Sequence, residues 1–218
     1  MKYAIYALSA GKPTTHVLNG KELHTGFIKE QMQSDWLSKT GFTKDGQADT
    51  KNHGGEDKAL LMYPFDHYHY WETRFKQPFK VPSFGENITI SGLTEKDVCI
   101  GDIYKLGHAT IQVSQPRQPC YKIADVHSIK NIPAVVTETG YTGYYFRVLE
   151  EGNVTNSDQL QLIDQKKQQV SIAFIHRILF HDRNNAKGIE VILNVDELAS
   201  SLRESLTKKL ATLTGNNG

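Results

Sequence analysis

The sequence predicts a mainly β domain, a barrel or a sandwich interrupted by at least one helix, followed by a small helical region. Three observations predict this class. Up to about residue 155, many short strand-like runs are bounded by glycine and proline. Residues 65–75 carry aromatic side chains at helical spacing. After about residue 165, aliphatic side chains recur at the spacing of amphipathic helices. We therefore expect one domain over residues 1–160 and a second over residues 165–218.

The strands are predicted from apolar runs that end at turn residues. Asn19-Gly20 separates two of them and is a strong signal for a two-residue hairpin. Ala109–Val113 alternates between apolar and polar residues before a stretch with two prolines. The predicted strands cover residues 3–8, 14–18, 22–28, 87–90, 103–106, 109–113 and 143–149.

Four helices are predicted from spacing and capping signals. Pro64 suits the first turn of a helix over residues 65–75. Ser171 is a suitable N-cap for a helix ending near residue 180, and a short helix is expected over residues 185–193. Asn194 with Glu197 resembles a capping box, which predicts a last helix starting there. Its apolar positions are Leu198, Leu202, Leu206 and Leu210.

Composition limits the function classes. The 218 residues include 25 Lys and Arg against 24 Asp and Glu, so the formal charge is +1 and no general attraction to nucleic acid is expected. Two cysteines cannot form a disulfide framework or a four-cysteine zinc site. No apolar run reaches about 18 residues, so we expect no membrane span and a cytoplasmic location. A monomer and a homodimer both fit.

One polar stretch, residues 47–59, gathers groups suited to binding an anion. Lys51, Asn52 and His53 precede the pair Gly54-Gly55, whose backbone can approach a ligand closely, and Lys58 follows. Backbone N–H groups beside a lysine suit an oxyanion such as phosphate. The alternative is a polar surface turn that uses the glycines for its geometry.

A second stretch, residues 114–122, holds a thiol in a proline-rich loop. Arg117 lies three residues before Cys120, and a nearby cation favours the thiolate, which attacks electrophiles or binds metal. A buried structural cysteine is the alternative, and Cys99, between Val98 and Ile100, fits that description better. In a third stretch, residues 83–87, Asn87 lies in a turn before a strand, where a structural role and a ligand contact are both reasonable.

Together these stretches resemble the MOSC family, named for the C-terminal domain of molybdenum-cofactor sulfurase, and especially its stand-alone bacterial YiiM-type members. The resemblance runs in order through most of residues 1–150, and the helical region resembles the small three-helix domain that follows MOSC in such proteins. The matching motifs are Asp45–Asp49, Asn52–Gly55, Asp57–Ala59, Tyr63–Pro64, His67–Tyr68, Tyr70–Trp71, Phe84–Asn87, Gly92–Leu93, Ile100–Asp102, Gln112–Arg117, Pro119–Cys120 and Lys122.

The resemblance implies a MOSC-type β-barrel with an inserted helix and a molybdenum cofactor based on molybdopterin. It implies that Cys120 ligates molybdenum, and that the protein reduces N-hydroxylated compounds such as hydroxylaminopurines, amidoximes or hydroxamates. Electrons would come from a separate flavin or iron–sulfur reductase. The resemblance also carries a family-level expectation of pyridoxal phosphate binding.

Residue chemistry is compatible with those implications. Molybdenum favours a soft thiolate, and the phosphate of the cofactor needs cations and N–H donors, which Lys51 and Arg117 would supply. His53 would orient a ligand or deliver a proton. The pterin edge would be bound by hydrogen bonds from Asn87, Ser114 and Gln115. In the glycine-containing loop, Asn52, Gly54 and Gly55 are further candidates to bind the cofactor.

One feature departs from the family pattern. Mitochondrial relatives carry an arginine directly before the ligand cysteine, whereas this chain has Pro119 there and Arg117 three residues back. Two other functions stay open. The chain could carry the cofactor or a sulfur-bearing form of it without turnover, or act as a hydrolase with Cys120 as nucleophile and His53 as base.

Overall fold

Seven strands close into a β-barrel in this computed structural model, which describes residues 1–49 and 54–215. Their order is β13-β9-β10-β11-β7-β8-β1, and β1 pairs again with β13, Lys2 lying opposite Gln161. The short strand β4 (Glu30–Gln31) continues this sheet beyond β1. The barrel strands are β1 (Lys2–Ala10), β7 (Leu60–Pro64), β8 (Ile88–Ile90), β9 (Ile103–Leu106), β10 (Ala109–Pro116), β11 (Tyr144–Glu150) and β13 (Gln159–Asp164).

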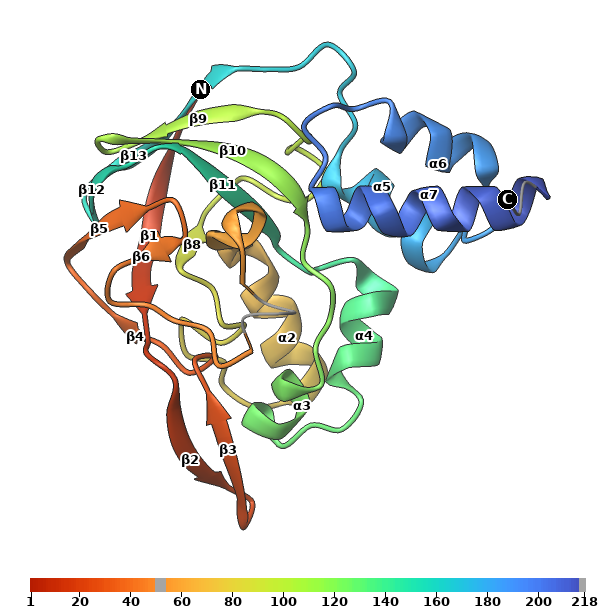
Figure 1. Cartoon of the computed structure of the whole chain (residues 1–218). Helices are drawn as coiled ribbons and strands as arrows, with labels where there is room; N and C mark the ends of the chain where they lie inside the picture. Colours follow the sequence, from red (N-terminus) through yellow and green to blue (C-terminus); the bar gives the residue numbers. More distant parts are fainter. Residues whose placement is uncertain (50–53, 216–218) are drawn as a thin grey trace.

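The predicted hairpin is present as β2 (Thr14–Leu18) and β3 (Lys21–Thr25), which project from the barrel (Figure 1). Leu18 pairs with Lys21, so Asn19 and Gly20 form the two-residue loop. Their φ values of 53° and 75° are both positive, as a type I′ turn requires. A small sheet of β12 (Gly152–Thr155), β5 (Ser34–Ser38) and β6 (Gly41–Phe42) lies beside the barrel.

Helices cover one end of the barrel near the hairpin (Figure 1). The helix predicted over residues 65–75 is present as the 3₁₀ turn η2 (Phe65–His67) followed by α2 (Tyr68–Phe75). Pro64 does not lie in its first turn. Instead it ends β7 with an extended backbone, and it lies opposite Ile90 in the pairing with β8. Two further helices, α3 (Lys122–His127) and α4 (Ile132–Thr139), were not predicted, and both are short.

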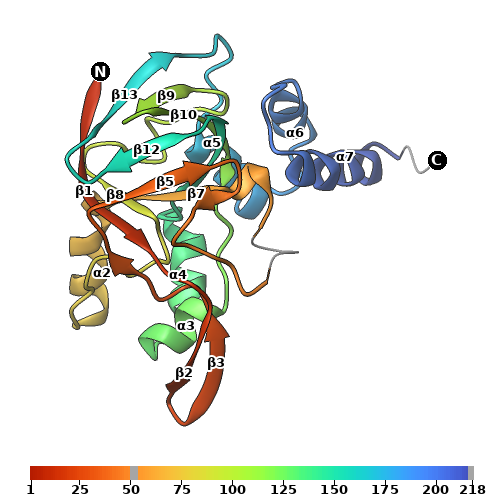
Figure 2. The same cartoon turned by 60° about the vertical axis from the view of Figure 1, so that its left-hand side comes forward.

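Three helices form the C-terminal region: α5 (Ile172–Phe180), α6 (Ala186–Leu193) and α7 (Ser200–Thr214). They lie together at one side of the barrel in two views (Figures 1 and 2). Ser171 caps α5 as predicted, since its hydroxyl accepts a hydrogen bond from the Phe174 N–H at 3.2 Å. None of the helices in residues 1–49 and 54–215 is long and apolar enough to cross a membrane.

The capping box predicted at Asn194 is wrong. Asn194 instead ends α6, and its N–H donates to the Glu190 carbonyl. The last helix begins at Ser200 because the Ala199 N–H is bound at 3.0 Å to the Ser114 carbonyl in β10. A tertiary hydrogen bond therefore sets the start of this helix, and the local sequence signal does not.

Asp57 links the start of α7 to strand β11 of the barrel. One carboxylate oxygen accepts from the backbone N–H of Ser200 at 3.0 Å, with the Ser200 hydroxyl at 3.2 Å. The other oxygen lies 2.6 Å from a guanidinium nitrogen of Arg147 in β11. Burial by itself would raise the pKa of Asp57, but the bonds from Ser200 and the charge of Arg147 outweigh it and hold that pKa below its ordinary value.

Replacing Asp57 with asparagine is expected to reduce the free energy of unfolding by about 1–2 kcal/mol near neutral pH. Because the folded carboxyl has the lower pKa, its contribution is present above about pH 4 and is lost as the pH falls through the folded pKa. Urea unfolding at pH 7 and at pH 3 measures both effects. The exposed neighbour Glu56, changed to glutamine, is the matched control; equal losses in the two variants would contradict the assignment.

Candidate functional site

A pocket opens where the loop after β3, the 45–49 loop, the 84–87 turn and the loop between β10 and α3 meet. Its cavity volume is about 80 Å³, and its empty space is about 600 Å³ when the open mouth is included. Four cationic side chains line it against two carboxylates, so it favours an anion. We call it the cationic pocket; its lining residues include Phe27, Lys29, Asp45, Asp49, Lys58, Phe84, Asn87, Arg117, Cys120, Lys122 and Tyr145.

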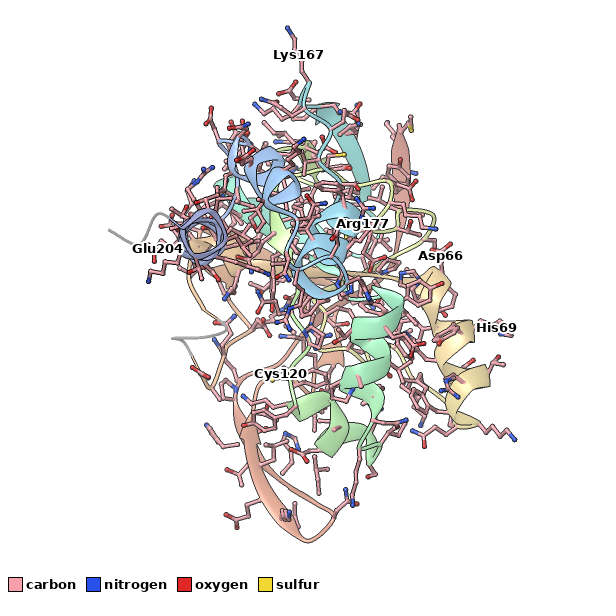
Figure 3. All side chains as sticks on the ribbon, turned by 90° about the vertical axis from the view of Figure 1, so that its right-hand side faces the viewer. Asp66, His69, Cys120, Lys167, Arg177 and Glu204 are labelled. Carbon is pink, nitrogen blue, oxygen red and sulfur yellow. The ribbon has the colours of Figure 1, made fainter. Side chains whose placement is uncertain are left out.

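Cys120 lines this pocket. It lies on the loop that leads into α3 (Figure 3). It is half-buried and lines two hollows at once, the cationic pocket and a second one beside α7. The other cysteine, Cys99, lies in a different environment. Cys99 is buried at the entry to the helical region, and burial raises the pKa of its thiol to about 11. Cys120 lines the cationic pocket and the second hollow, whereas Cys99 lines neither of them.

Arg117 brings a buried positive charge into the cationic pocket. The residue is 4% exposed, and its backbone N–H donates to the Gly143 carbonyl at 3.1 Å. Its guanidinium lies over the Phe27 ring, 5.8 Å from the centroid. Within the part of the chain that the structure describes, its Nη1 has no hydrogen-bond partner and it forms no ion pair. A buried guanidinium without a counterion is a strong site for an anionic ligand.

The second buried cation is already paired. Lys29 and Asp45 form an ion pair in which the side chains are 5% and 2% exposed. Asp45 also accepts from the Gly11 N–H at 2.9 Å and from the Asn87 side-chain amide at 2.8 Å. Burial lowers the pKa of Lys29, and the charge of Asp45 partly opposes that shift. This pair leaves little net charge at its wall of the pocket.

Asn87 lines the pocket but has its side chain engaged by protein groups. Its amide nitrogen donates to Asp45, and its amide oxygen accepts from the Leu61 N–H at 3.1 Å. The backbone of Asn87 is bonded to Leu61 and Ser9. Asn87 therefore links β1, β7 and the 45–49 loop through its own hydrogen bonds.

The other predicted residues fall in three places. Ser114 is fully buried and does not line the cationic pocket within the described residues; its hydroxyl lies 2.5 Å from the Asp57 carbonyl and 3.1 Å from that of Tyr145. Gln115 lines the second hollow, and Gly54 and Gly55 line a neighbouring depression near Lys12. Lys51, Asn52 and His53 lie outside the described residues.

One wall of the pocket, formed by Thr25, Gly26 and Phe27, was not predicted from the sequence. These residues were expected to belong to a strand that extends to residue 28, but β3 ends at Thr25. The strand ends at Thr25 because the backbone at Gly26 packs closely against the backbone at Gly46. A Cβ atom on Gly26 would lie 2.2 Å from the Gly46 carbonyl oxygen. A glycine inside a predicted strand is the signal that could have marked this close approach.

Comparison with known proteins agrees with the fold and with the two regions. The MOSC domain model matches residues 49–161, and the model described as the YiiM-like, 3-alpha helix domain matches residues 170–213. The protein YflK of Bacillus subtilis (strain 168) is 46% identical over 209 residues, covering 95% of each chain. The crystal structure of YiiM from Geobacillus stearothermophilus superimposes with a TM-score of 0.83 at 38% identity, covering 96% of this chain and all of that one.

A longer relative carries a functional name. A protein named "Reductase" in Gibberella moniliformis (strain M3125 / FGSC 7600) is 32% identical over 167 residues, which are 73% of this chain but 29% of that protein. The matches in sequence and in structure thus join the barrel and the three helices in one arrangement. The chain belongs to the MOSC domain family and carries the YiiM-like three-helix domain after its barrel.

Proposed function

We propose that the chain binds a pterin-based molybdenum cofactor in the cationic pocket and reduces N-hydroxylated compounds with electrons from a separate reductase. One observation carries the proposal. The half-buried thiol of Cys120 and the unpaired guanidinium nitrogen of Arg117 line the same pocket. A ligand that carries both a soft metal and a phosphate would suit the chemistry of these two groups.

The residues fit such a ligand in charge and chemistry. Arg117, Lys58 and Lys122 supply positive charge that Asp49 balances only in part, since Asp45 is paired with Lys29. The narrow cavity suits a group of phosphate size, and a pterin would need the wider mouth. Cys120, at the edge of the pocket, would hold the metal within reach of both hollows.

Reduction of an N–O bond consumes two electrons and two protons and releases water, leaving an N–H bond where the hydroxyl group was. The cofactor supplies the electrons when it is bound. Lys58 is placed to supply a proton from its Nζ, because it lines both hollows beside Cys120. Burial lowers its pKa, with Asp57 and Asp49 opposing the shift, and this makes the ammonium a better acid. The role proposed for His53 concerns a residue outside the described ranges.

The test compares protein made in a host that synthesises the cofactor with protein made in a cofactor-deficient strain. Turnover of an aromatic amidoxime with an added reductase is expected from the first preparation only. Molybdenum bound without turnover would favour the cofactor carrier instead. Hydrolysis that is equal in both preparations would favour the cysteine hydrolase, since that chemistry needs no metal.

A further inference from the structure

The cationic pocket and the second hollow beside α7 adjoin one another. Lys58, Cys120 and Tyr145 are the described residues that line both spaces. The second hollow has a cavity volume of about 490 Å³, within the range of small-molecule sites, whereas the cationic pocket is much narrower. We call the place where these three side chains border both spaces the junction. The proposed function uses Lys58 and Cys120 there but leaves Tyr145 without a role.

Tyr145 offers an open hydroxyl group at the junction. The residue lies in β11 and is half-buried. Its hydroxyl has no hydrogen-bond partner among the described residues, yet it is not one of the enclosed polar atoms that lack a partner there. The hydroxyl oxygen therefore keeps accessible surface, and because the side chain lines both spaces, a ligand at the junction can reach it.

The preceding tyrosine of the same strand has its hydroxyl bound by the protein. Tyr144 is fully buried, and its hydroxyl donates to the Leu93 carbonyl at 2.8 Å. Successive side chains of a strand point to opposite faces, so Tyr144 packs in the barrel core while Tyr145 faces outward. Tyr144 lines neither the cationic pocket nor the second hollow. The two neighbours therefore form a matched pair for an experiment.

The surroundings of Tyr145 keep its hydroxyl protonated. Burial raises the pKa of Tyr145 above its ordinary value; the charge of Arg117 opposes that rise, and Cys120 adds to it. At neutral pH the group is therefore an O–H donor rather than a phenolate. The Lys58 ammonium is a second donor that lines the same junction. Two donors at one place suit an oxygen atom on which negative charge develops.

We propose that Tyr145 is a catalytic residue, whose hydroxyl donates a hydrogen bond to the oxygen that leaves in the proposed N–O reduction. That reaction consumes two electrons from the reductase and two protons, and it releases the oxygen as water. Lys58 delivers a proton to the oxygen, and Tyr145 keeps its own proton throughout. Its hydrogen bond forms with the bound substrate and strengthens as the N–O bond breaks and charge collects on the oxygen. This inference rests on the proposed function for the reaction, but the contact with the oxygen is separately measurable.

The first experiment compares the kinetics of Tyr145→Phe and Tyr144→Phe, each loaded with cofactor and supplied with reductase. Tyr145→Phe is expected to lower kcat for benzamidoxime by about tenfold or more and to raise KM by about fivefold at most, with bound molybdenum equal to wild type. Tyr144→Phe should keep kcat within about twofold of wild type, although it leaves the Leu93 carbonyl without its donor. Wild-type kcat in Tyr145→Phe, or an equal loss in both variants, overturns the inference.

The second experiment measures binding by calorimetry in protein from a cofactor-deficient host. Its probes are benzohydroxamic acid and benzamide, which differ by the one N-linked oxygen and are both uncharged near neutral pH. Wild type and Tyr144→Phe should bind the hydroxamic acid about fivefold more tightly than the amide, and Tyr145→Phe should bind the two about equally. If this pattern holds while no preparation reduces benzamidoxime, the contact of Tyr145 with the oxygen stands and the proposed function fails. No preference in wild type, or the wild-type preference in Tyr145→Phe, overturns the inference.

Discussion

Cys120→Ala is expected to lower the turnover of an N-hydroxylated substrate by about 100-fold or more, because the thiol is the group proposed to hold the metal. The thiol lies at the edge of two hollows and is only half-buried, so its removal should shift the melting temperature by no more than about 3 °C. Steady-state kinetics with a saturating reductase and a thermal melt measure the two effects.

The second cysteine provides the control for that variant. Cys99→Ala removes a buried thiol that lines neither the cationic pocket nor the second hollow beside α7. It should retain turnover while losing about 1 kcal/mol of stability. If Cys99→Ala abolishes turnover and Cys120→Ala does not, the assignment of the two thiols is reversed.

Asp45→Asn is expected to cost roughly 3–5 kcal/mol of folding free energy, since it leaves the Lys29 ammonium buried without its counterion. Because the asparagine amide has nearly the same shape as the carboxylate, the loss of folding free energy measures the effect of removing the charge. Urea unfolding at pH 7 measures the effect. The double variant Lys29→Met with Asp45→Asn should recover much of the lost stability, because no unpaired charge remains.

The pH dependence of Asp45→Asn gives an independent check. Burial lowers the pKa of Lys29, and removing the opposing carboxylate lowers that pKa further. Between the folded pKa and the ordinary value near 10.4, the unfolded chain binds a proton that the folded chain does not, so stability rises with pH. Within that interval the cost should therefore be largest at the lower end and shrink toward pH 10. A cost independent of pH would mean that the pair does not control the charge of Lys29.

Local signals in the sequence predicted the elements that local geometry controls. Asn19-Gly20 marked the hairpin because a two-residue loop needs two positive φ values, and Ser171 marked a helix start because it caps that helix itself. The last helix was placed too early because its start depends on the Ser114 carbonyl, which is distant in sequence. The chain order of short strands could not show which strands close the barrel.

The candidate site shows the same contrast between local signals in the sequence and contacts that depend on distant residues. Cys120 and Arg117 were predicted from chemistry and spacing, and the structure brings them to one pocket. Asn87 and Ser114 were predicted as ligand contacts, yet their side chains bond to protein groups. Lys29 was missed, because its role requires Asp45 to come within reach from 16 residues away. Gln115 was also predicted as a pterin contact, and it lines the second hollow beside α7.

The ratio of molybdenum to protein tests the central claim most directly. Wild type, Cys99→Ala and Cys120→Ala would be purified from one host that makes the cofactor, and metal would be measured by mass spectrometry. We expect molybdenum near one per chain in wild type and Cys99→Ala, and at most about a tenth of that in Cys120→Ala. Wild type without molybdenum, or Cys120→Ala with as much of it as wild type, would contradict the account.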